Sequence, residues 1–190
     1  NEDIALMRTI PGMTVINPAD DTEAKMAVRA AFECDGPVYM RFGRFAVPVF
    51  NDEATYKFEV GKAIKLNDGD DVTIIATGLM VNEAVQAAKK LKEEGINADV
   101  LNIHTIKPLD DEAVLASAKK TGKVVTVEEH SVIGGLGSAV CDLLSEKHPV
   151  PIKKIGMNDE FGMSGSAADL LEHYGFSADN IVKTVKELLK

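Results

Sequence analysis

The sequence has no tryptophan, only 5% aromatic residues and only two cysteines among its 190 residues. Cys34 and Cys141 stand alone, without the C-x-x-C spacing of a zinc or redox motif. Two thiols do not make the disulfide framework of a small secreted protein. One long-range disulfide is the alternative, but we favour two small, buried, reduced side chains in a cytoplasmic protein. The four histidines form no H-x-H or H-x-x-x-H pair, so we expect no metal site.

Positive charge is also scarce, since 21 Lys and Arg face 30 Asp and Glu and give a net charge of −9. Nucleic acid is therefore an unexpected partner, because its phosphates would be repelled. No apolar run approaches the roughly 18–20 residues that a membrane span requires. The first residues show neither the basic nor the apolar region of a signal peptide. Residue 1 is Asn rather than Met, which suggests that the chain begins inside a longer protein.

Short β-branched runs alternate with helical patterns from about residue 70 onward. We predict strands at 72–76, 99–103, 123–128 and 152–155, and helices at 80–94, 111–120, 138–147, 167–174 and 180–189. Asp110 and Ser177 stand where helix N-caps belong. Strands separated by helices of about 10–15 residues indicate right-handed βαβ crossovers. Residues 70–190 are therefore predicted to form one α/β domain with a mostly parallel, doubly wound sheet.

The first fifty residues predict only part of a second α/β domain. A helix over 2–9 is stopped at Pro11, strands are expected at 13–16 and 38–42, and the capping box Asp20-x-x-Glu23 begins another helix. About 45 residues are too few to enclose a core of their own. We therefore interpret residues 1–50 as a partial domain and residues 51–69 as a linker with one extended segment.

An incomplete domain would expose apolar side chains that a missing part should cover. Ile4, Met7, Val15 and Val28 are the side chains for which we expect this exposure. Exposed apolar surface of this kind favours association with another chain. The simplest arrangement is a two-fold homodimer.

A glycine cluster, Ile133-Gly-Gly-Leu-Gly-Ser138, follows a predicted strand and opens a helix. The free N–H groups of such a helix can bind an anion. A dinucleotide fingerprint, however, needs G-x-G-x-x-G in the turn directly after the first strand of its unit. The spacing here is G-G-x-G, several residues after the strand. We therefore favour a structural turn that packs the helix on the sheet, or on a neighbouring subunit, over a nucleotide site.

Three titratable residues, Glu128, Glu129 and His130, lie at the carboxyl end of the same predicted strand. Open α/β sheets bind ligands at this edge, and two carboxylates with an imidazole can transfer protons. Neighbours on a strand face opposite sides, so at most one of the two glutamates shares a face with His130. We favour a polar strand end that satisfies loop N–H groups, and the sequence alone leaves the role of these three residues open.

Arg44 follows the predicted strand at 38–42 and stands beside Gly43. A guanidinium at the carboxyl end of a strand is well placed to bind a phosphate or carboxylate with two hydrogen bonds. Taken alone, the position is equally typical of a surface arginine in an ion pair, which we take as the default interpretation.

Four segments together resemble the transketolase family: Pro11-Gly-Met-Thr-Val-Ile-Asn-Pro-Ala-Asp20, Gly36-Pro-Val-Tyr-Met-Arg-Phe-Gly-Arg44, Ile106-Lys-Pro-Leu-Asp110 and Val125-Thr-Val-Glu-Glu-His-Ser-Val-Ile-Gly-Gly-Leu-Gly137. The resemblance covers essentially the whole chain. Phe161-Gly-Met-Ser-Gly165, followed by Tyr174-Gly175, looks more like transketolase proper than like its relatives. Those relatives are the 1-deoxyxylulose-5-phosphate synthases and the β subunits of 2-oxo acid dehydrogenases, whose C-terminal parts remain alternatives, as does a stand-alone binding or regulatory module with this fold.

The resemblance implies the end of a pyrimidine-binding domain followed by a transketolase C-terminal domain. The intact enzyme would move two-carbon ketol units between sugar phosphates in the pentose phosphate pathway, as a cytoplasmic homodimer using thiamine diphosphate and Mg²⁺. The groups that bind and activate this cofactor lie, in the family, upstream of residue 1. We therefore expect no catalytic, cofactor-binding or metal-binding residue in this chain, and no activity from it alone.

One family residue does carry over. Transketolases hold the sugar phosphate with an arginine at the end of the pyrimidine domain, four residues before a proline, and Arg44 with Pro48 matches that position. The residue before it is Gly43, where transketolases often have Ser. The resemblance thus assigns Arg44 to the substrate phosphate, and assigns the segment from Glu128 to Gly137 to packing rather than chemistry.

Overall fold

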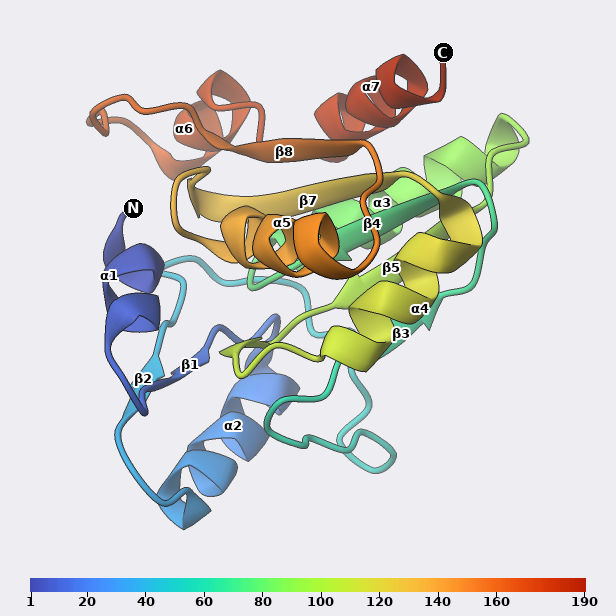
Figure 1. The fold of residues 1–190 in the computed structure, drawn as a ribbon. Helices are drawn as coiled ribbons and strands as arrows, with labels where there is room; N and C mark the ends of the chain where they lie inside the picture. The colour runs from blue at the N-terminus through green and yellow to red at the C-terminus, as the bar shows by residue number, and fades with distance from the viewer.

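A computed structural model describes residues 1–190. A five-stranded sheet forms its centre, with the strand order β3-β5-β4-β7-β8 (Figure 1). The strands are β3 (Ile64–Asn67), β4 (Val72–Ala76), β5 (Ala98–Asn102), β7 (Val124–Ser131) and β8 (Ile152–Met157). Four of them are parallel, and only the edge strand β3 runs antiparallel, against β5. This arrangement confirms the predicted α/β fold with a mostly parallel sheet.

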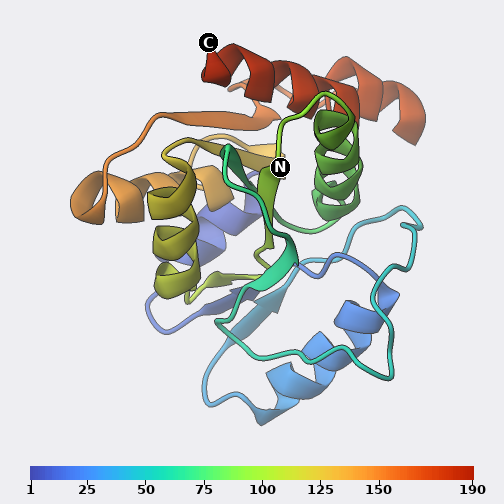
Figure 2. The same cartoon turned by 90° about the vertical axis from the view of Figure 1, so that its right-hand side faces the viewer.

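Helices cover both faces of this sheet (Figure 2). On one face lie α3 (Met80–Glu93) and α7 (Ala178–Leu189), and on the other lie α4 (Asp111–Thr121) and α5 (Leu136–Lys147). A shorter helix, α6 (Ala167–His173), follows β8. The predicted N-caps are present, since Asp110 accepts the N–H of Ala113 at 3.1 Å and Ser177 accepts that of Asn180 at 3.3 Å. Because helices pack on both of its faces, the sheet is doubly wound.

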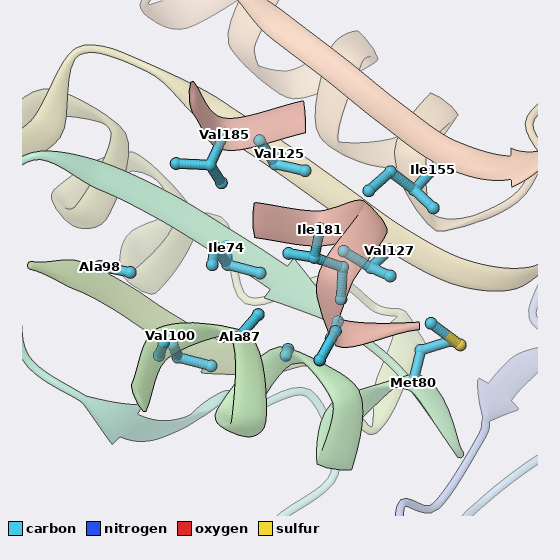
Figure 3. Close-up of a cluster of buried hydrophobic side chains, with 14 of the residues drawn as sticks. Ile74, Met80, Ala87, Ala98, Val100, Val125, Val127, Ile155, Ile181 and Val185 are labelled. Carbon is cyan, nitrogen blue, oxygen red and sulfur yellow. The ribbon is translucent and has the colours of Figure 1, made fainter. Parts of the chain in front are cut away.

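The larger core lies between the sheet and the pair α3 and α7 (Figure 3). β-Branched side chains point from adjacent parallel strands toward the two helices, among them Ile74 of β4 and Val125 of β7. From α7, Ile181 and Val185 close the layer, and Ile74, Val125, Ile181 and Val185 are all fully buried. Strands buried on both faces explain why these segments are short and continuously apolar.

A second, three-stranded sheet combines strands of the first fifty residues with one strand of the C-terminal region. Its order is β2-β1-β6, where β1 is Thr14–Ile16, β2 is Val38–Met40 and β6 is Thr105–Lys107. β1 pairs with β2 in parallel and with β6 antiparallel. The first fifty residues also form α1 (Asp3–Thr9) and α2 (Asp21–Glu33). β6, which the sequence pattern did not predict, comes from the C-terminal region, so the small sheet takes its third strand from outside the first fifty residues.

The segment 51–69, interpreted above as a linker, contributes to the larger sheet. Its last part is β3, the antiparallel edge strand, so the sheet of the C-terminal region begins at Ile64 rather than near residue 70. Residues 51–63 form no helix or strand. They run past α2 before reaching β3 (Figure 2).

Two expectations about exposure were wrong. Ile4 and Val15 are fully buried, because they pack in one cluster with Val124 and Leu136 of the C-terminal region. Met7 is half-buried beside the same cluster, whereas Val28 is exposed as expected. The surface that covers Ile4 and Val15, which the sequence analysis assigned to a missing part, therefore belongs to this chain.

The two cysteines are unpaired thiols. Cys34 and Cys141 are each partly exposed, rather than buried as expected. No helix in the structure combines the length and apolar character that crossing a membrane demands.

Candidate functional site

Arg44 lies in a segment without regular structure that follows the carboxyl end of β2. Its side chain is exposed and forms no hydrogen bond or ion pair. Together with Arg41 and Gly43 it lines an open recess of about 350 Å³, which Asp3 of α1 and Glu129 of β7 also reach. The ion pair that we took as the default interpretation of Arg44 is therefore absent, and its guanidinium is free to meet an anion.

Arg41, three residues earlier, is held from two sides. Its Nε lies 3.1 Å from Oδ2 of Asp3, and its Nη1 lies 3.0 Å from Oε2 of Glu129. The Tyr39 hydroxyl donates to the same Asp3 oxygen at 2.9 Å. Partial burial acts to raise the pKa of Asp3, but Arg41 and the Tyr39 hydroxyl outweigh it and hold this pKa below its ordinary value. Arg41 is thus paired with two carboxylates, and Arg44 is the cation of the recess that has no carboxylate partner.

Glu128 points away from this recess into the interior. Its two oxygens accept the backbone N–H groups of Leu136 at 2.7 Å and Gly137 at 2.8 Å, at the start of α5. Full burial raises the pKa of Glu128 to about 7, although these N–H donors oppose the rise. A side chain at Gly135 could not fit, since a Cβ would lie 2.0 Å from the carboxylate. Glu128 therefore satisfies loop N–H groups, as the sequence interpretation favoured.

His130 shares the face of Glu128 and is fully buried as well. Its Nε2 accepts the N–H of Ala5 in α1 at 3.4 Å, so its Nδ1 carries the proton and donates to the Ser131 carbonyl at 2.8 Å. Burial lowers the pKa of His130. The imidazole is therefore neutral and serves to dock α1 against β7.

The glycine cluster contributes to the same docking. Arg8 of α1 donates to the carbonyls of Gly134 and Gly135, the latter at 2.9 Å. A Cβ at Gly134 would lie 2.6 Å from that of Ala5. This turn packs against a helix of the same chain, which fits the structural interpretation of the cluster.

Sequence reasoning missed one buried carboxylate, Glu23. It accepts the N–H of Ala19 at 2.5 Å, the amide of Asn102 at 2.8 Å and the hydroxyl of Tyr56. Its burial raises its pKa to about 7. The capping box signalled its place at the start of α2, but nothing in the sequence signalled the contacts with β5 and with the segment 51–63. This carboxylate joins the two regions of the molecule.

Comparison with known proteins agrees with this architecture. The family model described as "Transketolase, pyrimidine binding domain" matches residues 1–49, and that described as "Transketolase, C-terminal domain" matches residues 61–181. The chain therefore belongs to the transketolase family. Within it, the chain corresponds to a partial, C-terminal portion of a transketolase-type enzyme.

Three relatives illustrate the relationship. The 6-deoxy-6-sulfo-D-fructose transketolase subunit SqwH of Clostridium sp. (strain MSTE9) is 50% identical over 98% of this chain and 58% of its own length. An apulose-4-phosphate transketolase subunit of Phocaeicola vulgatus is 44% identical over 99% of this chain and 60% of its own length. A solved structure described as "Split gene transketolase, inactive beta4 tetramer" superimposes with a TM-score of 0.95 at 48% identity, covering 99% of this chain and 61% of that one. The chain thus spans somewhat more than half the length of these relatives.

Members of this family are thiamine-diphosphate enzymes. The residues of this chain do not by themselves fit that cofactor and its metal ion. No group of three or more metal-binding side chains comes together. The two buried carboxylates with a raised pKa, Glu23 and Glu128, are both fully engaged in internal hydrogen bonds. We therefore derive no step of a reaction through the cofactor from residues 1–190.

Proposed function

We propose that this chain supplies the substrate-phosphate contact of a transketolase-type enzyme, and that Arg44 makes this contact. The complete enzyme would transfer a two-carbon ketol unit between sugar phosphates. The observation that carries the proposal is the free, exposed guanidinium of Arg44 in a recess where the neighbouring Arg41 is already neutralised.

The chemistry of the recess supports an oxyanion as ligand. A sugar phosphate near neutral pH carries close to two negative charges, and a planar guanidinium donates to two of its oxygens at once. The pairing with Arg41 offsets one of the two negative charges of Asp3 and Glu129 and so reduces their repulsion of an incoming anion. Arg44 also lies where the two regions of the molecule meet, a common position for ligand sites.

The names of two relatives narrow the substrate class. One refers to a sugar that carries a sulfo group, and the other to a sugar that carries a phosphate. Both groups are tetrahedral oxyanions that a guanidinium binds in the same way. We propose that the substrate of this protein is a ketose or aldose with a terminal phosphate. Comparing kcat/KM for this sugar with kcat/KM for its sulfonated analogue would define which of the two oxyanions the protein prefers.

The cofactor and the assembly complete the proposal. Thiamine diphosphate and Mg²⁺ would bind to a part of the enzyme outside residues 1–190, and this chain alone would be inactive. It would work as a subunit or portion of a cytoplasmic oligomer, with a homodimer as the simplest form. Relatives named as transketolase subunits support a role of this kind.

The test uses the complete enzyme with Arg44→Ala. Losing one charge-assisted contact should cost about 1.5–3 kcal/mol, so kcat/KM for phosphorylated sugars should fall roughly ten- to a hundredfold. Values for hydroxypyruvate, which carries no phosphate, should stay unchanged. Arg44→Lys keeps the charge but loses the paired hydrogen bonds, and should recover part of the loss.

A matched control is Arg29→Ala, which removes an exposed arginine of α2 that takes no part in lining the recess. It should leave both substrate types unaffected. Equal losses for phosphorylated and unphosphorylated substrates in Arg44→Ala would mean that Arg44 acts through structure. No loss for either would reject it as the phosphate contact.

A second candidate activity rests on a weaker likeness. The 1-deoxy-D-xylulose-5-phosphate synthase of Heliobacterium modesticaldum is 41% identical over 98% of this chain, which corresponds to 29% of that protein. Formation of 1-deoxy-D-xylulose 5-phosphate by the complete enzyme, instead of ketol transfer, would favour this alternative. Arg44 would keep the same role, because that product also carries a phosphate.

A further inference from the structure

We infer that Glu129 is a positioning residue for the anion-binding segment: through Arg41, it fixes the segment that carries Arg44 to the C-terminal sheet. The role of Arg44 itself rests on the function proposed above. The inference concerns how Arg44 is held in position. It gives the C-terminal region an indirect part in substrate binding, because Glu129 itself does not touch the substrate.

The segment that carries Arg44 is hydrogen-bonded only at its ends. At its start, the Arg41 N–H donates to the Ile16 carbonyl at 2.8 Å, continuing the pairing of β2 with β1. At its far end, the N–H groups of Phe50 and Asn51 donate to Asp20 at 3.0 and 2.8 Å. Residues 42–49 form no hydrogen bond between these two points. The hydrogen-bonded anchor nearest to Arg44 is therefore Arg41.

The side chain of Arg41 is what ties this anchor to the rest of the molecule. It is only 15% exposed, and its partners Glu129 and Asp3 are 25% and 28% exposed. Ion pairs that are this well shielded hold a geometry better than pairs in open solvent. Asp3 belongs to α1, whereas Glu129 belongs to β7, so Glu129 is the partner that reaches into the larger sheet.

The alternation of side chains along β7 explains why Glu129 is available for this task. Glu128 and His130 face the interior, where the start of α5 and the helix α1 occupy them. Glu129, between them, faces the recess. The three consecutive titratable residues thus divide into two that face inward and one that faces outward. Glu128 binds the start of α5, His130 docks α1, and Glu129 braces the segment of Arg44.

The charges of this ion pair also act on the recess. With both carboxylates in place, Arg41 is more than compensated, and Arg44 is the one arginine of the recess without a carboxylate partner. Without Glu129, Arg41 would keep Asp3 alone and would lose its only link to β7. Removing Glu129 also removes one negative charge from the recess, which by itself would favour an anion. Weaker binding of a phosphorylated sugar would therefore report the less defined position of Arg44 and not a loss of attraction.

The experiment compares Glu129→Ala, Glu129→Gln and Arg44→Ala in the complete enzyme. Glu129→Ala should raise KM for a phosphorylated sugar roughly three- to tenfold, with little change in kcat and none for hydroxypyruvate. Glu129→Gln keeps an oxygen acceptor for Arg41 and should recover part of this effect. In the Arg44→Ala background, Glu129→Ala should add nothing, because the residue that it positions is gone.

A second readout does not depend on substrate. Trypsin cuts after exposed arginines in mobile segments, so the rate of cleavage after Arg44 reports the local freedom of the segment. Glu129→Ala should accelerate this cleavage severalfold. Glu112→Ala is the matched control, since Glu112 is 92% exposed and forms only a loose pair with Lys62 at 3.9 Å.

The outcomes separate this inference from the proposed function. If Arg44→Ala leaves phosphorylated substrates unaffected, the proposed phosphate contact is wrong, and the cleavage rate alone decides whether Glu129 braces the segment. If Arg44→Ala acts as expected but Glu129→Ala changes neither KM nor cleavage, the brace is rejected. Equal losses for hydroxypyruvate, or losses that add fully in the double variant, would also overturn it.

Discussion

The two regions of the molecule bury their apolar side chains in different ways. Of the 21 residues in the larger buried cluster, only Ala19 comes from the first fifty residues, and of the 13 in the second only Ile4 and Val15 do. The helices of the C-terminal region enclose their sheet from both sides. By contrast, α2 presents Val28 and Phe32 to solvent, with exposed fractions of 51% and 93%. The N-terminal region has no buried cluster of its own. It therefore depends on its contacts with the C-terminal region, which we call the junction.

Several connections make up that junction, among them the ion pair of Arg41 with Glu129. β6 supplies the third strand of the small sheet, α1 docks on β7 and the start of α5, and Glu23 binds Asn102 of β5. The last of these also holds Tyr56 of the connecting segment. Since the site around Arg44 lies at the same junction, its geometry depends on both regions at once.

The largest expected effect comes from the core of the C-terminal region. Ile74→Ala removes three methylene or methyl groups from a fully buried position at the centre of the sheet. We expect a loss of about 2–5 kcal/mol in the free energy of unfolding, measured by urea denaturation. Val28→Ala on α2 should stay within about 0.5 kcal/mol, because that side chain is half in solvent. Similar losses at the two positions would contradict the contrast between the regions.

The sequence predicted the elements of the C-terminal region well for the same reason that this region encloses its own core. Its strands and helices each carry a complete apolar pattern, so local periodicity and packing agree. α3 was expected at 80–94 and lies at Met80–Glu93, and α4 was expected at 111–120 and lies at Asp111–Thr121. What the sequence did not predict is β6, a strand of three residues whose formation depends on pairing with β1, about ninety residues earlier in the chain.

A smaller effect comes from pH, where each region has one buried carboxyl group with a pKa of about 7. Burial raises the pKa of Glu23 at the junction and that of Glu128 in the C-terminal region. A carboxyl group with a raised pKa favours the folded state at low pH, and this contribution is lost as the pH rises from about 4.5 through 7. Relative to Glu23→Gln or Glu128→Gln, the parent protein should therefore lose roughly 1–3 kcal/mol of its advantage between pH 5 and 8.

Urea denaturation at pH 5, 6, 7 and 8 measures this difference. The lowered pKa of buried His104, about 4, acts in the opposite direction, because a histidine kept neutral stabilises the fold above its unfolded pKa and loses this as the pH falls. That contribution is present in parent and variants alike and cancels in the comparison. A difference that stays constant from pH 5 to 8 would show that neither carboxyl group titrates in this range.

The candidate site shows which contacts the sequence could not predict. Family resemblance led to Arg44, and the structure shows it exposed and unpaired in the recess. Nothing in the sequence connects Arg41 with Glu129, which lie 88 residues apart. Both do stand at the carboxyl ends of strands, and that shared position is the only local signal that they could meet. Contacts between regions depend on how the regions dock, and a local pattern does not contain this information.

The smallest expected effect compares two N-caps, one at the junction and one inside the C-terminal region. Ser177 caps α7 through one hydrogen bond, so Ser177→Ala should cost about 0.5–1 kcal/mol. Asp20 caps α2 through the N–H of Glu23 at 2.9 Å and also accepts the N–H groups of Phe50 and Asn51. Asp20→Ala should therefore cost about 2 kcal/mol, because it also releases the far end of the Arg44 segment. Asp20→Ser, which retains a cap but cannot reach both linker groups, should recover about half of that loss in urea denaturation. If Asp20→Ala costs no more than Ser177→Ala, the bonds to Phe50 and Asn51 contribute nothing to stability, and the junction rests on its other connections.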